Sequence, residues 1–362
     1  MKQNYKEYNR RNKEDLIRLW ETALISFDTN ILLDLYRNTP FIFEKFIEFT
    51  EGFHDRVFLT HQVGLEYSRK RFDIINENIK VLDNKLQEIS SFETKTKELT
   101  YYKYLSEKIK QDITKEIQTF KSKIADRKKS LLELNKNDII YEKLDAIFSN
   151  SIEQEFKKND YGEIITEGIV RYASNIPPGS EDKDKERGNP YGDLLIWKSL
   201  IRKSKTSKKP IIFVTNEKKN DWVWTLKDGT QMGTHPELVK EMCAETGFDF
   251  TTCDFENFFR SGCSPLKKTI DFDKLKKEFV FESIFETPLP INLSNHGSPN
   301  RLGAIDIAFL INEKSNLEKE LNLLRSSQLE AKEKETKTQQ LSNQIAAINM
   351  QINAGPTGPY GK

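Results

Sequence analysis

The feature that most constrains this chain is a short apolar run that ends at an acidic residue and is followed at once by a second apolar pattern. Residues 23–27 have the length of a buried strand, and residues 31–36 resume the apolar pattern of the helix expected next. Between them stand Asp28, Thr29 and Asn30. Open α/β sheets bind ligands at the carboxyl ends of their strands, so Asp28 is our first candidate for an active-site ligand. The alternative is that Asp28 or Thr29 only caps the helix.

Further acidic residues stand at similar boundaries between strands and helices. They are Glu66, Asp193, Glu217 and Asp221. Each has a structural alternative: a solvated helix acid for Glu66, a helix cap for Asp193, and turn residues for the last two. A lone carboxylate in an apolar stretch, as at Asp193, needs a partner. Separate structural roles would have to coincide at all of these positions. A single site that uses all of the acids is the simpler explanation.

With these acidic positions, the chain resembles the PIN-domain nucleases. Their pattern is strand-Asp-Thr-Asn, a helical Glu, a helical Asp before an apolar stretch, and strand-Thr-x-Asp with a further acid. The matching positions are Asp28, Asn30, Glu66, Asp193, Thr215, Glu217 and Asp221. The resemblance covers residues 20–75 and 160–255 and is greatest to a bacterial PIN-like branch with a long helical insertion. Glu217 departs from the usual Asp, which leaves open whether Glu217 or Asp221 completes the site.

The resemblance implies an α/β fold, namely a PIN-like three-layer α/β/α domain with a central parallel sheet. It also implies a metal-dependent nuclease that hydrolyses phosphodiester bonds, with RNA favoured over DNA as the substrate. Bacterial PIN-like enzymes are associated with toxin and phage-defence roles. These are expectations about fold and function for the structure to test.

Clustered carboxylates raise one another's pKa values, so they must share protons or bind a cation. Oxygen ligands suit Mg²⁺ or Mn²⁺, and histidine and cysteine are too sparse here to suggest zinc. Two such ions would stabilise both the attacking and the leaving oxygen of a phosphodiester. We expect Asp28 to bridge them, with Glu66, Asp193 and either Glu217 or Asp221 completing the ligands. Three neighbours are expected to orient the carboxylates by hydrogen bonds: Asn30, Thr215 and Asn216.

The net charge of +1 gives no global support for nucleic-acid binding, so any attraction must be local. Basic side chains do flank the proposed ligands, although such runs are often only solvated surface. The clusters are Arg69, Lys70 and Arg71; then Lys183, Lys185 and Arg187; and finally Lys218 and Lys219. We expect these residues to contact phosphates.

Apolar residues at helical spacing between Glu66 and Asp193 predict an antiparallel helical hairpin, inserted at about 72–150 with its turn near 90–96. The insertion and the rest of the nuclease domain occupy residues 1–265 in this interpretation. The predicted remainder is a connecting segment at 266–300, a coiled-coil helix at 301–353 and a flexible Gly/Pro-rich tail at 354–362. A helix that long needs a partner, so we expect a homo-oligomer or a bound partner protein.

The chain has no long apolar run, and its three cysteines form no CxxC pair. We therefore expect no membrane insertion and a cytoplasmic protein with reduced thiols. Two rival functions remain at this point. A haloacid-dehalogenase-type phosphatase also begins strand-Asp-x-Asp, but Asn30 replaces the second acid. A catalytically silent coiled-coil scaffold would use the acids only as caps.

Overall fold

The structure is a computed structural model, and it describes residues 5–9, 11–180, 189–217 and 220–279. All of these residues lie in the first of two units into which the chain divides, residues 1–285. The predicted coiled-coil helix and tail, residues 301–362, lie outside the described residues.

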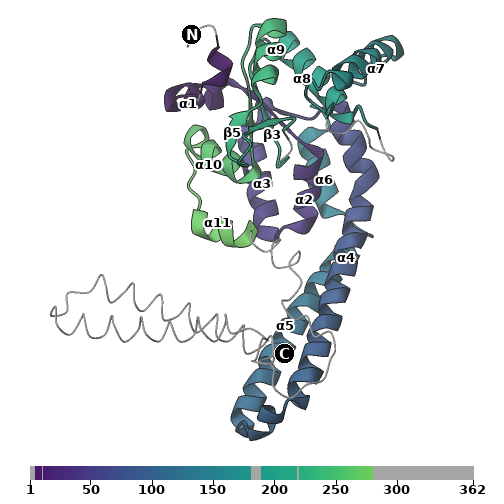
Figure 1. Cartoon of the computed structure of the whole chain (residues 1–362), viewed down its shortest axis with the longest axis vertical. Helices are drawn as coiled ribbons and strands as arrows, with labels where there is room; N and C mark the ends of the chain where they lie inside the picture. Colours follow the sequence, from purple (N-terminus) through teal and green to yellow (C-terminus); the bar gives the residue numbers. More distant parts are fainter. Residues whose placement is uncertain (1–4, 10, 181–188, 218–219, 280–362) are drawn as a thin grey trace, which may run out of the picture. The chain divides into compact units, whose positions relative to one another are not determined.

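A parallel four-stranded sheet forms the centre of this unit, which confirms the expected α/β class (Figure 1). The strands are β1 (Leu24–Phe27), β2 (Val57–Phe58), β3 (Ile211–Val214) and β6 (Phe250–Cys253), in the spatial order β2-β1-β3-β6. Every residue of β1 and β3 is buried, as expected for central parallel strands covered on both faces. Phe27 is in register with Val214, and Val214 with Cys253. The carboxyl ends of three strands therefore meet at one edge.

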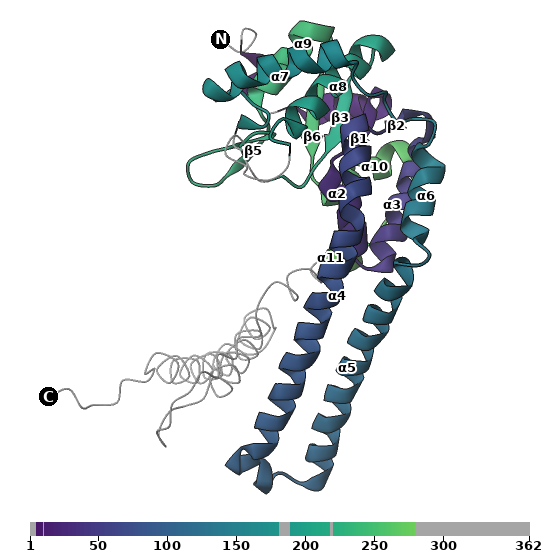
Figure 2. The same ribbon diagram turned by 90° about the vertical axis from the view of Figure 1, so that its right-hand side faces the viewer.

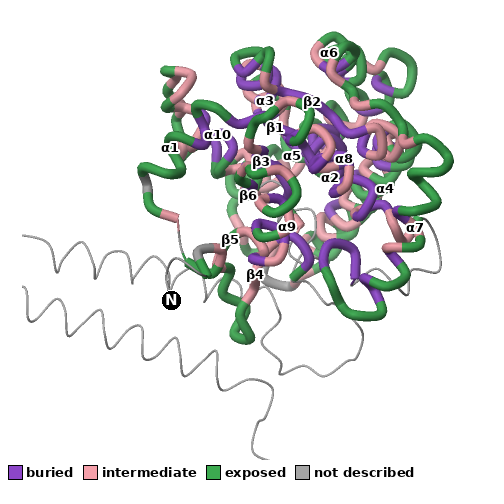
Figure 3. Tube along the Cα trace, turned by 90° about the horizontal axis from the view of Figure 1, so that it is seen from above, coloured by how far each residue is buried: buried purple, intermediate pink, exposed green. Residues whose placement is uncertain are grey.

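Helices cover both faces of the sheet. Helices α8 and α9 lie over one face, where the rings of Trp197 and Phe250 are 4.9 Å apart, and α3 and α10 lie over the other, where Phe27 and Phe46 are 5.0 Å apart. The bounds of these helices are Gly192–Ser207 (α8), Pro236–Thr246 (α9), Pro40–Phe53 (α3) and Phe255–Leu266 (α10). Buried residues gather around the sheet between these layers (Figure 3).

The predicted helical hairpin is present as α4 (His61–Glu98) and α5 (Glu107–Leu134), which run side by side beyond the sheet (Figure 2). Its turn lies at Thr100–Tyr104, later than we predicted. Ser90 and Thr94 do not break α4, because their hydroxyls donate to carbonyls one turn back, at 2.8 and 3.1 Å. Leu82 and Ile124 are buried in the hairpin seam, whereas Phe120 is exposed.

The remaining elements complete the unit. They are η1 (Lys6–Tyr8), α1 (Lys13–Thr22), α2 (Thr29–Arg37), η2 (His54–Arg56), α6 (Ile139–Phe148), α7 (Lys158–Ala173), β4 (Val223–Thr225), β5 (Gln231–Thr234) and α11 (Phe272–Phe279). Helix α11 falls in the predicted connecting segment, yet its Leu275 is fully buried in the core. Among the described residues, no helix is long and apolar enough to cross a membrane.

Candidate functional site

The chain leaves β1 toward β2 on one side of the sheet, while β3 lies on the other side, so a topological switch point falls between β1 and β3. Asp28 and Thr215 are the first residues after these two strands. The Asp28 amide donates to the Val214 carbonyl and the Thr215 amide to the Cys253 carbonyl, each at 2.9 Å. Parallel pairing therefore fixes the backbone at the point where open α/β sheets bind ligands.

The Asp28 carboxylate does not cap the helix that follows it. Asp28 occupies the N-cap position of α2, but its side chain makes no capping hydrogen bond. Its Oδ2 instead accepts a hydrogen bond of 2.8 Å from Thr215 Oγ1. Asp254, which follows β6 in the same way, does cap α10 by accepting from the Asn257 amide at 2.7 Å. The capping alternative thus holds for Asp254 and not for Asp28.

Electrostatics at Asp28 disfavour its charged form. Burial raises the pKa of this carboxyl group from 3.8 to about 6, and the negative charges of Glu66 and Glu217 add to the rise. Hydrogen bonds from the Thr215 hydroxyl and the Thr29 backbone oppose it. A half-buried carboxyl group with acidic neighbours is therefore partly protonated near neutrality.

Glu66 lies in the second turn of α4 and faces this site. Its carboxylate accepts hydrogen bonds from Gln62 Nε2 at 2.8 Å, Lys70 Nζ at 3.2 Å and Thr29 Oγ1 at 3.4 Å. The side chain is 21% exposed, so it is not the solvated helix acid of the structural alternative. Thr29 directly follows Asp28 and contacts both acids, with its backbone hydrogen-bonded to the Asp28 carboxyl group and its hydroxyl to Glu66.

Asp193 lies one residue inside α8, whose N-cap is Tyr191, so it does not cap that helix. The preceding Gly192 packs against Glu66: a Cβ atom at this glycine would lie 2.8 Å from Glu66 Oε1. The start of α8 therefore packs against the Glu66 carboxylate, and half-buried Asp193 is the next residue along the chain. The close approach explains a glycine at position 192.

The two acids after β3 have different surroundings. The Glu217 amide donates to Thr215 Oγ1 at 3.0 Å, and the Glu217 charge acts on Asp28. Asp221 is 1% exposed and accepts from Ser180 Oγ at 3.0 Å, and its charge acts on His235. Of these two acids, Glu217 is thus the one whose charge raises the pKa of Asp28.

The three residues expected to orient carboxylates also differ. Thr215 contacts both Asp28 and Glu217, as described. Asn216 joins other elements: its Oδ1 accepts from the Phe255 amide at 3.0 Å and its Nδ2 donates to Asp34 at 3.4 Å. Asn30 is exposed on α2.

The chain was compared with family models, curated proteins and solved structures. A family model described as a PIN-like domain matches residues 24–238, which is more than half of the chain. The chain belongs to the PIN-like domain family. No curated protein and no solved structure matches it. PIN-like domains are generally nucleases, so membership indicates a nuclease-type hydrolase with a nucleic-acid substrate.

In this PIN-like domain the basic residues of α4 are not equivalent. Lys70 forms an ion pair with Glu66. Arg71 Nε lies 3.4 Å from Asp138 Oδ2, and the Arg71 guanidinium carbon lies 4.5 Å from the centroid of the Tyr141 ring. Arg69 is exposed and makes no hydrogen bond or ion pair with the described residues. The other predicted phosphate contacts, Lys183, Lys185, Arg187, Lys218 and Lys219, lie outside the described residues.

Sequence reasoning missed two partners of Glu66, namely Gln62 and Thr29. Gln62 and Lys70 stand four residues before and after Glu66, so both lie on its helix face, and that spacing could have identified them. The Thr29 contact depends on how α2 and α4 pack, which local spacing does not reveal.

Within the described ranges, no group of three or more histidine, cysteine, aspartate or glutamate side chains is arranged to hold a metal ion. Mg²⁺ is commonly bound through one or two carboxylates, with water and substrate phosphates completing its coordination. The hard oxygens of Asp28 and its acidic neighbours match that donor set.

Proposed function

We propose that this PIN-like domain is a Mg²⁺- or Mn²⁺-dependent nuclease that hydrolyses phosphodiester bonds in RNA. In this proposal Asp28, Glu66, Asp193 and Glu217 hold the metal, and Asp221 is a structural residue. The observation that carries it is the orientation of Asp28, whose carboxylate leaves the capping position free and lies with Glu66 and Glu217 at the switch point of the sheet.

A purely structural role accounts poorly for these acids. Carboxylates that disfavour one another's charge in a half-buried site destabilise the fold. A bound cation offsets that cost, and family membership supplies the reaction class. An ion held by these carboxylates would supply positive charge to the phosphate oxygens and would make a water molecule more acidic.

The chain's own residues hold the carboxylates in place. Thr215 donates to the Asp28 carboxylate and accepts from the Glu217 backbone amide, so one hydroxyl orients Asp28 and holds the backbone of Glu217. Gln62 and Thr29 hold Glu66. Hydrogen bonds of this kind fix the orientation of metal ligands and typically change metal affinity about 10- to 100-fold when removed.

RNA is preferred over DNA as the substrate because the chain's motif is most like that of bacterial PIN-like enzymes. The phosphatase alternative has less support, because the position of its general acid is occupied by the exposed Asn30. The scaffold alternative treats the acids as caps, and Asp28 makes no capping bond.

The test is cleavage of end-labelled single- and double-stranded RNA and DNA with Mg²⁺, Mn²⁺ or EDTA. We expect metal-dependent cleavage that is lost in Asp28→Asn. Asp254→Asn is the matched control, because Asp254 also follows a strand but caps α10, and asparagine caps equally well. Added Mn²⁺ should raise the melting temperature of the wild type and of the control but not of Asp28→Asn. Cleavage by Asp28→Asn, or no cleavage by the wild type, refutes the proposal.

A further inference from the structure

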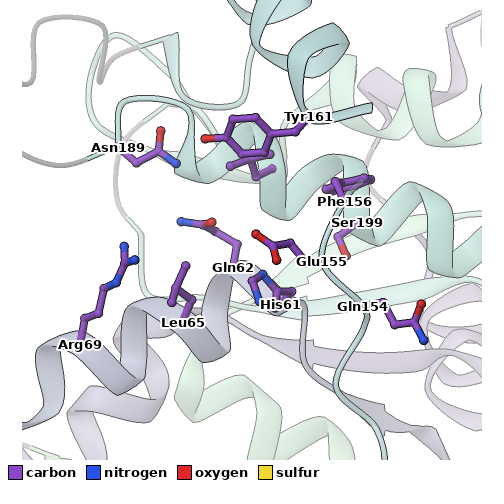
Figure 4. A pocket seen from close by; sticks show the side chains of 11 residues that line it. His61, Gln62, Leu65, Arg69, Gln154, Glu155, Phe156, Tyr161, Asn189 and Ser199 are labelled. Carbon is purple, nitrogen blue, oxygen red and sulfur yellow. The ribbon is translucent and has the colours of Figure 1, made fainter. Parts of the chain in front are cut away.

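A cavity of about 330 Å³ lies beside the carboxylate site, between α4, the segment before α7, and α8 (Figure 4). This volume is in the range of pockets that hold small organic groups, about 300–1,000 Å³. Gln62 is part of its wall and also donates to Glu66, so the cavity adjoins the proposed metal ligands. A group bound there would lie next to Gln62, the side chain that donates to Glu66.

Aromatic rings give the cavity a surface suited to a planar ligand. Tyr161 lies at its edge with 39% of its surface exposed, as Figure 4 shows. Phe156 lines the cavity too, but the Arg202 guanidinium already covers its ring at 4.1 Å from the centroid. Exposed aromatic rings stack the bases of single-stranded nucleic acids. Of the two rings, Tyr161 is therefore the one with a face open to a ligand.

Ser199 is an independent sign that the cavity takes a polar ligand. It lines the cavity from α8 and is 2% exposed, yet its Oγ has no hydrogen-bond partner among the described residues. A buried hydroxyl without a partner carries a desolvation cost. A ligand with hydrogen-bonding groups inside the cavity would remove that cost.

The charges of the lining favour a base over a phosphate, and one base over the others. Glu155 lines the cavity and makes no hydrogen bond or ion pair with the described residues. An ionised carboxylate only accepts hydrogen bonds and repels phosphate. Guanine presents two adjacent N–H donors to a carboxylate, whereas adenine, cytosine and uracil place an acceptor beside their donor. Arg69, also in the lining, supplies positive charge for the flanking phosphate.

We propose that this cavity binds one unpaired guanine of the RNA strand, stacked on Tyr161 and recognised by Glu155. The inference rests on the proposed nuclease function and adds a base preference to it. The strand must present the base unpaired, so a single strand or loop is the preferred substrate.

The test is fluorescence anisotropy in EDTA with two labelled RNAs, one carrying a single guanine in an adenine tract and one carrying inosine there instead. Inosine lacks the 2-amino group, so we expect about tenfold weaker binding by the wild type. Glu155→Gln should reduce that difference to less than about twofold. Tyr161→Ala should weaken binding of the guanine RNA at least fivefold, because one stacked base contributes about 1–3 kcal/mol and about 1.4 kcal/mol is tenfold. Tyr161→Phe retains the ring and should bind normally.

Glu163→Gln is the control, since Glu163 is an exposed acid on α7 outside the cavity lining. Equal affinity for the two RNAs, or a guanine preference that survives Glu155→Gln, overturns the inference. Parallel cleavage assays with Mg²⁺ separate the two proposals. Cleavage without a guanine preference leaves the nuclease and removes the guanine site. A guanine preference in binding without cleavage of any substrate retains the site and refutes the nuclease.

Discussion

Thr215 Oγ1 donates a 2.8 Å hydrogen bond to Asp28 Oδ2 between two residues that are 187 positions apart in the sequence. The same oxygen accepts from the Glu217 amide. Parallel pairing of β1 and β3 makes this contact possible, because Phe27 and Val214 are in register immediately before these residues. One buried hydroxyl therefore orients the Asp28 carboxylate and fixes the backbone at Glu217.

Thr215→Val should weaken metal binding while preserving the strand. Valine keeps the β-branched shape but removes the hydrogen bond that lowers the Asp28 pKa, so that pKa should rise above about 6. We expect the Mn²⁺ concentration for half-maximal cleavage to rise about 10- to 100-fold. The acidic limb of the pH–activity profile should also move to higher pH. Thr251→Val, which removes another largely buried hydroxyl from the sheet, should change neither quantity.

Asp28→Asn should stabilise the metal-free protein at neutral pH. The folded pKa of about 6 exceeds the ordinary 3.8, so the folded state binds this proton more tightly. The stabilising effect of protonation is complete below about pH 4 and is lost as the pH rises through about 6. Above that range the wild type carries a cost of the order of 1–3 kcal/mol, which the variant lacks. Urea unfolding in EDTA should show a larger difference at pH 7.5 than at pH 5. A wild type more stable than the variant at pH 7.5 would contradict the assignment.

Gly192→Ala should impair cleavage without unfolding the protein. The added Cβ would lie 2.8 Å from Glu66 Oε1, and the flexible end of the glutamate can move to relieve the overlap. We expect cleavage to fall at least tenfold while the melting temperature changes little. Gly64→Ala, two residues from Glu66 on α4, meets no atom within 4 Å and should leave activity unchanged. Equal activities of the two variants would show that Glu66 tolerates displacement.

Glu217→Gln and Asp221→Asn should fail in different ways. The negative charge of Glu217 acts on the Asp28 carboxyl group. Removing the Glu217 charge should therefore raise the Mn²⁺ requirement and leave stability intact. Asp221 is buried with Ser180, so its replacement should lower the melting temperature and leave the Mn²⁺ requirement of the folded fraction unchanged. Thermal melts and Mn²⁺ titrations of both variants decide between the two acids. The reverse pattern would make Asp221 the ligand.

Part of this fold was predictable from the sequence, because the continuous apolar runs of β1 and β3 are typical of buried parallel strands. The direction in which a carboxylate points was not predictable from the sequence. Asp28 and Asp254 both follow a strand and precede a helix, yet only Asp254 caps. The difference comes from Thr215, which the family pattern indicates as an orienting residue but which reaches Asp28 only through the pairing of β1 with β3.

The Thr-x-acid spacing after β3 favours Glu217 over Asp221, but the sequence does not predict where Asp221 lies. Four residues along a loop do not define a direction. The packing of Trp222 on Phe213, with ring centroids 4.7 Å apart, fixes the chain beside Asp221.

The sequence did not predict the β4–β5 hairpin, for a different reason. Asp228 and Gly229 form a turn signal, but the flanking strand β5 is largely exposed and lacks an apolar pattern.

Helix α4 is a single helix of 38 residues that holds Glu66 near its start and forms one side of the hairpin for the rest of its length. At about 1.5 Å per residue, about 48 Å of continuous helix separates Glu66 from the end of α4. One continuous helix thus connects the far end of the hairpin to the Glu66 carboxylate. A shift of the hairpin tip relative to the sheet would therefore be carried along α4 to the helical turn that holds Glu66.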